Sequence, residues 1–424
     1  MFLIDTVFLG VVPIINPTIF MAFLSLLVGI LGGLGALLLG YLIDLVSFIS
    51  FSQIKDIPLP LLGATGGLLV GLLTFFLAQE ARGRGIPEVI KAVDQHGGRI
   101  RPRVALVKTL ASALTIGTGG SAGREGPIAQ IGATLGSTVG QLLKLSEEQV
   151  VTLLACGAGA GIAATFNAPI AGTIFALEVI LRRFSIKLFS LVAISAVTGT
   201  LTSYLFLGNE PTFSVGSYSL ISPVELLLYA CLGIAAAFVA QLFLRVFNRT
   251  EELFKKMTKV PVWLLPALGG VAFGLIGCFL PETLGRGEKV MEQILCGQLN
   301  AAGFLALLCL AKIITTSLTL GSGGSGGTLF PSMFIGACLG GSFGSVAHSL
   351  MPGLVEGSGA YAIVGMGALF AAANKAPVTA IIMVLEMTCN QHLTLPLMFA
   401  CGISSILVRT VEKESIHTMH FASH

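Results

Sequence analysis

Long apolar segments recur along the whole chain and constrain its fold more than any other feature. A helix needs about 20 apolar residues to cross the hydrocarbon core of a bilayer. The runs at 128–143 and 169–181 are shorter. We therefore expect half-helices there, ending inside the protein where backbone groups find partners. The apolar runs occupy residues 18–50, 58–80, 104–118, 128–143, 149–164, 169–181, 188–207, 223–245, 262–280, 301–320, 332–350, 359–374, 377–388 and 393–409. This pattern predicts an all-α polytopic membrane protein.

Composition supports a protein whose solvent is membrane lipid. Of 424 residues, 54% are hydrophobic and 11% charged, against roughly a quarter charged in soluble domains. A net charge of +3 provides no strong basic field, which argues against a nucleic-acid partner. The eight cysteines form no CxxC pair and the six histidines are dispersed. We therefore predict no metal site, no disulfide framework and no cofactor.

Basic residues gather in two segments, 82–108 and 245–259. By the positive-inside rule, both segments are expected to face the cytoplasm of a multi-pass protein in the cell (inner) membrane. The alternative is a pair of solvated loops with no role beyond topology.

The chain also contains an internal repeat. When the sequence is shifted by 204 residues, 105–136 aligns with 309–340 and roughly half of the positions match. Lys108 then aligns with Lys312, and Gly123 with Gly327. The chain is interpreted as two related halves, 1–205 and 206–424. Repeated halves with interrupted hydrophobic segments point to a transport site near the bilayer midplane.

Four turns lead into proline and then into apolar sequence. Proline is favoured at the first helical position, so each turn is expected to begin a helix. A helix N-terminus has about four backbone N–H groups without intrahelical partners and carries about half a positive charge. Several such ends at membrane depth could replace the water around an anion; tight packing turns that bind nothing are the alternative. The turns are Gly85-Ile86-Pro87, Gly123-Arg124-Glu125-Gly126-Pro127, Gly327-Thr328-Leu329-Phe330-Pro331 and Asn167-Ala168-Pro169.

Glu125 stands at one of these helix starts, between apolar segments. An ionisable group in this setting is a candidate functional residue. Its carboxylate would compete with a mobile anion for the same N–H groups, and protonation would remove that attraction. We therefore predict that Glu125 is a proton-linked gate. The alternative is a structural salt bridge with the adjacent Arg124.

These motifs resemble those of the CLC family of chloride channels and proton/chloride exchangers. The turn at 123–127 matches the family's most specific motif, and those at 83–87 and 327–331 resemble its first and third anion-binding loops. The resemblance implies a homodimer in which each subunit has one anion pathway and two inverted-topology repeats with tilted, half-spanning helices. It also implies a compact prokaryotic type without cytoplasmic regulatory domains. The implied anion-binding residues are Arg84, Gly85, Ile86, Gly123, Arg124, Gly126, Thr328, Leu329 and His417.

The sequence departs from the family pattern at three anion-site positions. Arg84 replaces a frequent serine; its side chain either holds anions at the inner mouth or turns to the cytoplasm, and we favour the second. Leu329 replaces a common phenylalanine. His417 is the candidate for the place of a tyrosine that closes the inner side, although a plain terminal histidine is the alternative. Coordination is therefore expected mainly from backbone N–H groups at Gly85, Ile86, Thr328 and Leu329.

The proton route differs as well. Many exchangers of the family carry two adjacent glutamates where this chain has Glu178-Val179, and valine cannot carry a proton. Glu178 recurs in the second half as Glu386, and both are interpreted mainly as structural acceptors. Lys108 and Lys312 are interpreted as snorkelling or packing residues.

The resulting functional prediction is passive chloride transport through a pathway gated by Glu125. The alternatives are a proton-coupled chloride exchanger, with protons as a second substrate, or a fluoride- or nitrate-preferring relative. No nucleophile with a base, and no pair of acidic residues with histidine, falls within one membrane segment. An enzyme is therefore not expected.

Overall fold

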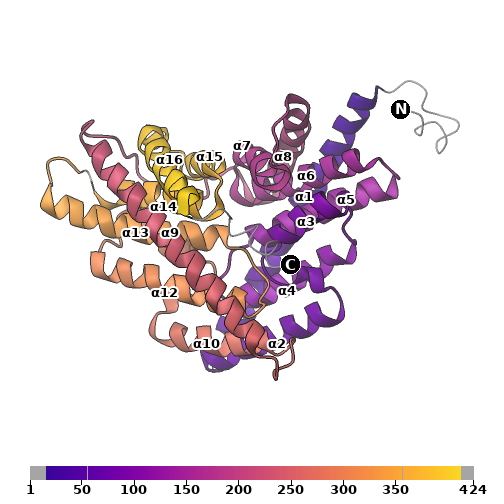
Figure 1. Ribbon diagram of the computed structural model, residues 1–424, viewed down its shortest axis with the longest axis horizontal. Coiled ribbons are helices and arrows are strands. Elements are labelled where there is room, and N and C mark those ends of the chain that lie inside the picture. Colours follow the sequence, from indigo (N-terminus) through magenta and orange to yellow (C-terminus); the bar gives the residue numbers. More distant parts are fainter. Residues whose placement is uncertain (1–15, 55, 356, 412–424) are drawn as a thin grey trace.

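The computed structural model describes residues 16–54, 56–355 and 357–411, which form sixteen α-helices and no strand (Figure 1). The helices are α1 Pro17–Phe48, α2 Leu59–Phe76, α3 Ile86–Gln95, α4 Arg103–Gly117, α5 Glu125–Leu142, α6 Glu147–Phe166, α7 Pro169–Phe175, α8 Ile186–Leu207, α9 Glu225–Lys256, α10 Leu265–Phe279, α11 Glu288–Leu295, α12 Ala302–Gly321, α13 Leu329–Leu350, α14 Ser358–Asn374, α15 Pro377–Thr388 and α16 Thr394–Val411. In Figure 1, α12–α16 gather on the left, and α4–α8 with α1 on the right.

Eight helical segments in the described ranges are long and apolar enough to cross a membrane. They are α1 with its extension to Gln53, α2, α6, α8, α9, α12, α13, and α16 with the turn before it. Pro169–Leu181 is a shorter apolar helix, as are α10, α14 and α15. The predicted all-α polytopic membrane fold is confirmed.

The expected half-helix at 128–143 differs from the observed element. Helix α5 has 18 residues and begins at Glu125, three residues earlier, because Gly126 and Pro127 form part of its first turn. Proline lacks a backbone N–H, which costs nothing where N–H groups have no intrahelical partner.

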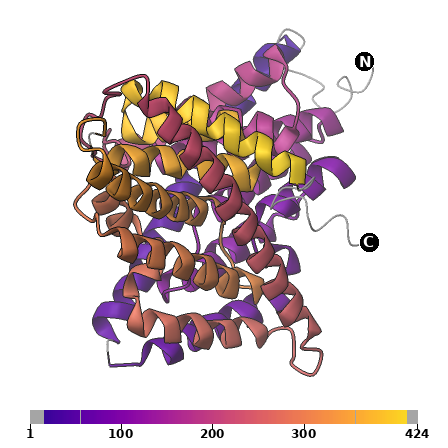
Figure 2. The ribbon, with the colours of Figure 1, turned by 60° about the vertical axis from the view of Figure 1, so that its left-hand side comes forward.

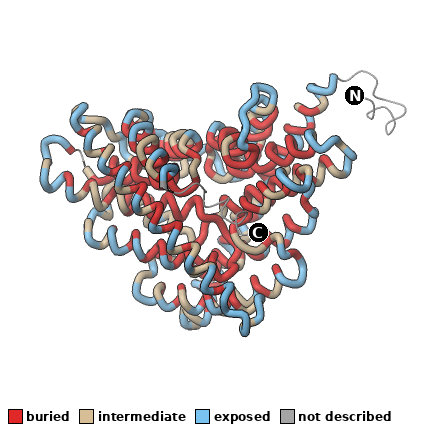
Figure 3. The backbone as a smooth tube through the Cα atoms, viewed as in Figure 1, coloured by how far each residue is buried: buried red, intermediate tan, exposed pale blue. Residues whose placement is uncertain are grey.

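Apolar side chains lie on the outside of the molecule as well as in its interior. Figure 3 shows where buried and exposed residues lie along the backbone. Ile186 is 88% exposed, Leu205 83% and Phe279 85%. Such exposure would promote aggregation in water and is expected on a surface that faces lipid. The protein is therefore an integral membrane protein, with lipid as the partner of this surface.

Glycines allow two pairs of helices to pack with their backbones in contact. An added Cβ at Gly132 of α5 would overlap the backbone of Gly157 in α6. In the second half, Gly336 of α13 meets Gly365 of α14 in the same way. Glycines recur every four residues in the sequence of both α5 and α13, at 132, 136 and 140 and at 336, 340 and 344. This spacing allows close helix contact, and the structure shows that contact.

Other pairs join the periphery to this core. Helices α9 and α16 lie side by side (Figure 2), and an added Cβ at Gly233 would lie 2.8 Å from the Ala400 oxygen. Helix α2 packs on α10. This contact joins the two sequence halves; their division after residue 205 stays a prediction.

Candidate functional site

The two repeated Gly-rich turns meet in a short antiparallel bridge. The Gly123 N–H donates to the Gly327 oxygen at 3.0 Å, and the Gly327 N–H donates to the Gly123 oxygen at 2.7 Å. These residues are the pair that the 204-residue shift aligns. The turn before α5 is therefore hydrogen-bonded directly to the turn before α13.

Beside the bridge, threonine hydroxyls of each half accept backbone N–H groups of the other half. The Ser121 N–H donates to Thr319 Oγ1 at 3.1 Å, and the Ser325 N–H donates to Thr115 Oγ1 at 3.0 Å. All four side chains are buried. Each half thus satisfies the buried backbone of the other, which fixes the two turns relative to each other.

The turn before α3 joins this cluster. The Gly326 N–H donates to the Gly83 oxygen at 3.2 Å. An added Cβ at Gly85 would lie 2.7 Å from the Gly126 oxygen, and one at Gly126 would lie 2.9 Å from Gly327 Cα. The N-termini of α3, α5 and α13 therefore converge. These are three of the four helix starts that the sequence analysis predicted.

Two buried lysines hold the Gly-Arg-Gly turns. Lys108 Nζ donates to the Ala81 and Gly83 oxygens at 3.2 and 2.6 Å. Lys312 Nζ donates to the Thr283 and Gly285 oxygens at 2.9 and 3.0 Å. Both lysines are fully buried. Of the two roles that the sequence analysis gave them, snorkelling or packing, the structure shows packing.

Glu125 lies at the centre of the cluster and is fully buried. Its Oε1 accepts the Phe330 N–H at 2.8 Å. Its Oε2 has no hydrogen-bond partner among the described residues. Phe330 is the second residue of α13, so the carboxylate occupies a helix N-terminus of the kind that attracts anions.

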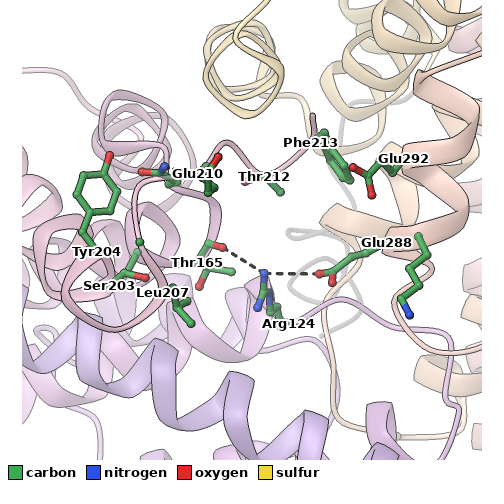
Figure 4. Close-up of a pocket in the computed structure, with 14 residues that line it drawn as sticks. Arg124, Thr165, Ser203, Tyr204, Leu207, Glu210, Thr212, Phe213, Glu288 and Glu292 are labelled. Carbon is green, nitrogen blue, oxygen red and sulfur yellow. Dashed lines mark hydrogen bonds and ion pairs between the residues drawn. The ribbon is translucent and has the colours of Figure 1, made fainter. Parts of the chain in front are cut away.

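The alternative role of Glu125, a salt bridge with Arg124, does not match the ion pair that Arg124 forms. Arg124 Nη2 donates to the Thr165 oxygen at 3.2 Å and forms an ion pair with Glu288 Oε1 at 3.5 Å. The recorded salt bridge of Arg124 is thus with Glu288 and not with Glu125. Arg124, Thr165 and Glu288 line a cavity of about 310 Å³, which lies beside the start of α5 and is bordered by α6, α8 and α11 (Figure 4).

Arg84 does not adopt the orientation that the sequence analysis favours, and a role in holding anions at the inner mouth stays a prediction. Its side chain is 5% exposed, so the favoured orientation toward the cytoplasm is wrong. The guanidinium lies 4.7 Å from the ring centroid of Phe247 and 3.9 Å from Glu251 Oε2, both on α9. Arg84 therefore stacks against α9, where the aromatic face and the carboxylate offset the cost of burying its charge.

Glu178 and Glu386 cap helices of the opposite half. Glu178 Oε2 accepts the Thr379 N–H at 2.7 Å, at the start of α15. Glu386 Oε2 accepts the Ala171 N–H at 2.6 Å, at the start of α7. The interpretation of both residues as structural acceptors is confirmed. Val179 is buried.

The remaining predicted residues are placed as follows. Thr328 precedes the first residue of α13, Leu329, and both are buried. Ile86 is the first residue of α3 and is also buried. His417 lies outside the described residues.

Glu288 is the charged residue that the sequence reasoning missed. It is the first residue of α11 and follows the repeated Gly285-Arg286-Gly287 turn. An acidic residue directly after a duplicated turn, in a chain with few charges, was the available signal.

Comparisons with known proteins agree with this arrangement. The sequence model described as voltage gated chloride channel matches residues 66–409. A ClcB-like protein of Ralstonia nicotianae, provisionally named as a chloride channel protein, is 34% identical; the match covers 85% of each chain. The H(+)/Cl(-) exchange transporter ClcA of Salmonella agona is 36% identical, with 80% of this chain and 74% of the relative covered.

A solved structure extends the likeness to the fold. The slow cyanobacterial Cl⁻/H⁺ antiporter superposes with a TM-score of 0.84 at 25% identity, over 96% of this chain and 98% of that chain. Family match, sequence identity and fold agree over most of the protein. The chain belongs to the voltage-gated chloride channel family, that is, the CLC family, and its general activity is anion transport across a membrane.

Proposed function

We propose that the protein exchanges chloride, or a similarly small anion, for protons, and that Glu125 is the gate. The observation that carries the proposal is the position of the Glu125 carboxylate on the Phe330 N–H at the start of α13. An anion that takes the place of this carboxylate gains the same donors. Carboxylate and anion therefore compete for one position.

The local chemistry supports binding without a fixed positive charge. Glycines at 123, 126 and 327 contribute no side chain, so an anion can approach the backbone closely. Helix N-termini attract an anion through partial charges, which allows fast release. We assign anion coordination to backbone N–H groups of the α3 and α13 starts, including Gly85, Ile86, Thr328 and Leu329.

Protonation supplies the link to a second substrate. A neutral Glu125 carboxyl loses most of its attraction to the α13 N-terminus and can leave the position to an anion. Each cycle of carboxylate displacement thus involves uptake and release of a proton at Glu125.

Exchange is preferred to the passive transport that the sequence analysis favours. The ClcA relative at 36% identity is named an exchange transporter, and the solved neighbour with a TM-score of 0.84 is named an antiporter. The expectation of passive conduction rested on Val179. A proton route through another side chain or through water is compatible with valine there.

Passive conduction is the second candidate, because one observation favours it. Both carboxylate oxygens of Glu178 accept hydrogen bonds from the start of α15. A carboxylate held in this way is poorly suited to carry protons, and the neighbouring Val179 has no titratable group.

Purified protein in liposomes distinguishes the candidates. A chloride gradient is imposed, potassium and valinomycin clamp the voltage at the proton equilibrium potential, and internal pH is recorded. Exchange predicts uphill proton movement at a fixed ratio to chloride. Chloride movement with no proton movement would establish passive conduction.

The same preparation tests anion preference and assembly. Replacing chloride by fluoride or nitrate in the imposed gradient ranks the three anions. The homodimer implied by the resemblance stays a prediction, checked by light scattering in detergent.

A further inference from the structure

A charged cluster centred on Glu288 lines the cavity of Figure 4. Glu288 Oε1 lies 3.5 Å from Arg124 Nη2 and 3.5 Å from Arg286 Nη1. One carboxylate oxygen is therefore shared by two guanidinium groups. Glu288 directly follows Gly287, the last residue of the turn before α11. Gly287 has a φ of 78°, a conformation that glycine adopts without strain.

The cluster joins three parts of the chain. Arg286 Nη2 also forms an ion pair with Asp44 of α1 at 2.9 Å. Arg124 stands directly before α5, whose first residue is Glu125. An acidic residue of the second half thus acts on the residue next to the gate in the first half.

Arg124 is held on the cavity side. In Figure 4, its Nη2 reaches both the Thr165 oxygen and Glu288. Both recorded partners bind the same nitrogen. The exposed fraction of the side chain is 21% for Arg124 and 31% for Glu288, so water screens this pair only in part.

Charged groups from several elements lie around Glu288, and Arg124 links them to Glu125. Arg124 is the cation that acts electrostatically on Glu125. The charged residues around Glu288 are Arg124 directly before α5, Arg286 of the preceding turn, Asp44 of α1, Lys289 and Glu292 of α11, and Glu210 across the cavity.

We propose that Glu288 is a positioning residue for the gate: it holds the Arg124 guanidinium at the cavity and neutralises part of its charge, and so sets the pH at which Glu125 opens. This inference rests on the role of Glu125 in the proposed function. The carboxylate of Glu288 binds neither anion nor proton in the cycle and acts through Arg124.

The sign of the effect follows from the charges. Without the Glu288 carboxylate, the positive charge of Arg124 acts more fully on Glu125 and favours its ionised form. Protonation then requires a lower pH, so the pH of half-maximal chloride flux falls. Removing Arg286 has the opposite effect, because Glu288 and Asp44 lose a shared cation and the local potential becomes more negative.

The test measures chloride efflux from liposomes over a range of pH. Glu288→Gln is expected to lower the half-maximal pH by roughly half a unit, the size expected for one charge acting through a partly hydrated region. Arg286→Gln is expected to raise it. Glu288→Asp keeps the charge and is expected to restore most of the parent profile.

Glu292→Gln is the matched control, because Glu292 lies on the same helix and lines the same cavity. It removes the same charge without an ion pair to Arg124. Equal shifts for Glu288→Gln and Glu292→Gln would overturn the inference, since only the summed charge of the cavity would then matter. Unchanged profiles in both Glu288→Gln and Arg286→Gln would overturn it too.

Repeating the Glu288→Gln measurement in Glu125→Gln protein separates this inference from the proposed function. In Glu125→Gln protein, the gate no longer titrates, so adding Glu288→Gln is expected to leave the pH profile unchanged. If the parent itself shows no pH-dependent flux, the gate proposal fails. If the parent profile depends on Glu125 but not on Glu288, the inference alone fails. Should Glu288→Gln fold poorly in detergent, Arg286→Gln still tests the sign.

Discussion

The Oε1 atom of Glu125 lies 2.8 Å from the backbone nitrogen of Phe330, and this contact crosses between the two halves of the sequence. Glu125 is the first residue of α5, and Phe330 is the second residue of α13. The carboxylate of one helix start therefore satisfies the N–H of the other. A side chain in this position is held by the attraction that would hold an anion.

Replacing Glu125 by glutamine is the direct test of this contact. Glu125→Gln removes the negative charge and mimics the protonated carboxyl. Chloride flux at neutral pH is expected to be at least that of the parent and to depend much less on pH. In the parent, flux is expected to rise as pH falls, because protonation frees the site. Chloride efflux from liposomes at acidic and neutral pH measures both.

The outcome that contradicts the gate is specific. If Glu125→Gln vesicles lose chloride efflux while the protein stays folded in size-exclusion chromatography, Glu125 supports structure. Its buried carboxylate would then serve only to satisfy the α13 N-terminus.

Arg84 is expected to matter more for stability than for anion choice. Arg84→Ser removes the stacking on Phe247 and one cation near Glu251, which should cost about 1–3 kcal/mol of stability. Lys255 still pairs with Glu251 at 2.9 Å. The preference for chloride over nitrate should change little, since coordination is assigned to backbone groups. Thermal denaturation and paired anion-flux assays measure the two effects.

Arg249→Ser is the matched control, because Arg249 is an exposed arginine on α9. It removes an equal charge without buried contacts and should leave the melting temperature nearly unchanged. A large change of anion selectivity in Arg84→Ser alone would place its guanidinium at the anion.

Close helix packing predicts a sharp response at Gly132. Gly132→Ala forces a Cβ into the backbone of Gly157, so α5 and α6 must separate; overpacking of this kind costs about 1–3 kcal/mol. Gly303→Ala is the control, because an added Cβ there meets nothing within 4 Å. Equal melting temperatures for the two variants would show that α5 and α6 can shift apart without penalty.

Features of the fold that follow from internal repeats or from regular spacing of residues were predicted from the sequence. Apolar runs predicted the helices. Four-residue glycine spacing indicated close helix contact, but the partner of α5, helix α6, needed the structure. The aligned pair Gly123 and Gly327 predicted related turns, although their direct hydrogen bonding needed the structure. Glu178 and Glu386 were recognised as acceptors because each recurs at a fixed distance from an Ala-Pro turn.

Contacts of charged side chains could not be predicted from repeats or spacing in the sequence. Arg84 was expected to turn to the cytoplasm. A buried arginine is rare without a partner. Its partners, Phe247 and Glu251, lie on α9, and no local pattern links them to position 84. The pair of Arg124 with Glu288 is equally remote in sequence. Such contacts depend on how the two halves pack.

The last prediction concerns the reciprocal caps and separates structure from proton transport. Glu178 accepts the Val378 N–H at 3.3 Å and the Thr379 N–H at 2.7 Å. Glu386 accepts the Ile170 N–H at 3.0 Å and the Ala171 N–H at 2.6 Å. Glutamine at either position replaces one acceptor oxygen by an NH₂ group that faces an N–H. Each variant should therefore lose about 1–3 kcal/mol of stability.

Both caps accept two backbone N–H groups, and Glu178 also accepts the Thr379 hydroxyl at 2.6 Å. Glu178→Gln and Glu386→Gln are therefore controls for each other. Both should lower the melting temperature by similar amounts and leave the ratio of protons to chloride equal to that of the parent. The voltage-clamped liposome assay measures that ratio. If Glu178→Gln abolished proton movement while chloride continued, and Glu386→Gln did not, Glu178 would carry protons in spite of its hydrogen bonds to α15. The proton route would then pass through the position next to Val179, and capping would be the lesser role of that carboxylate.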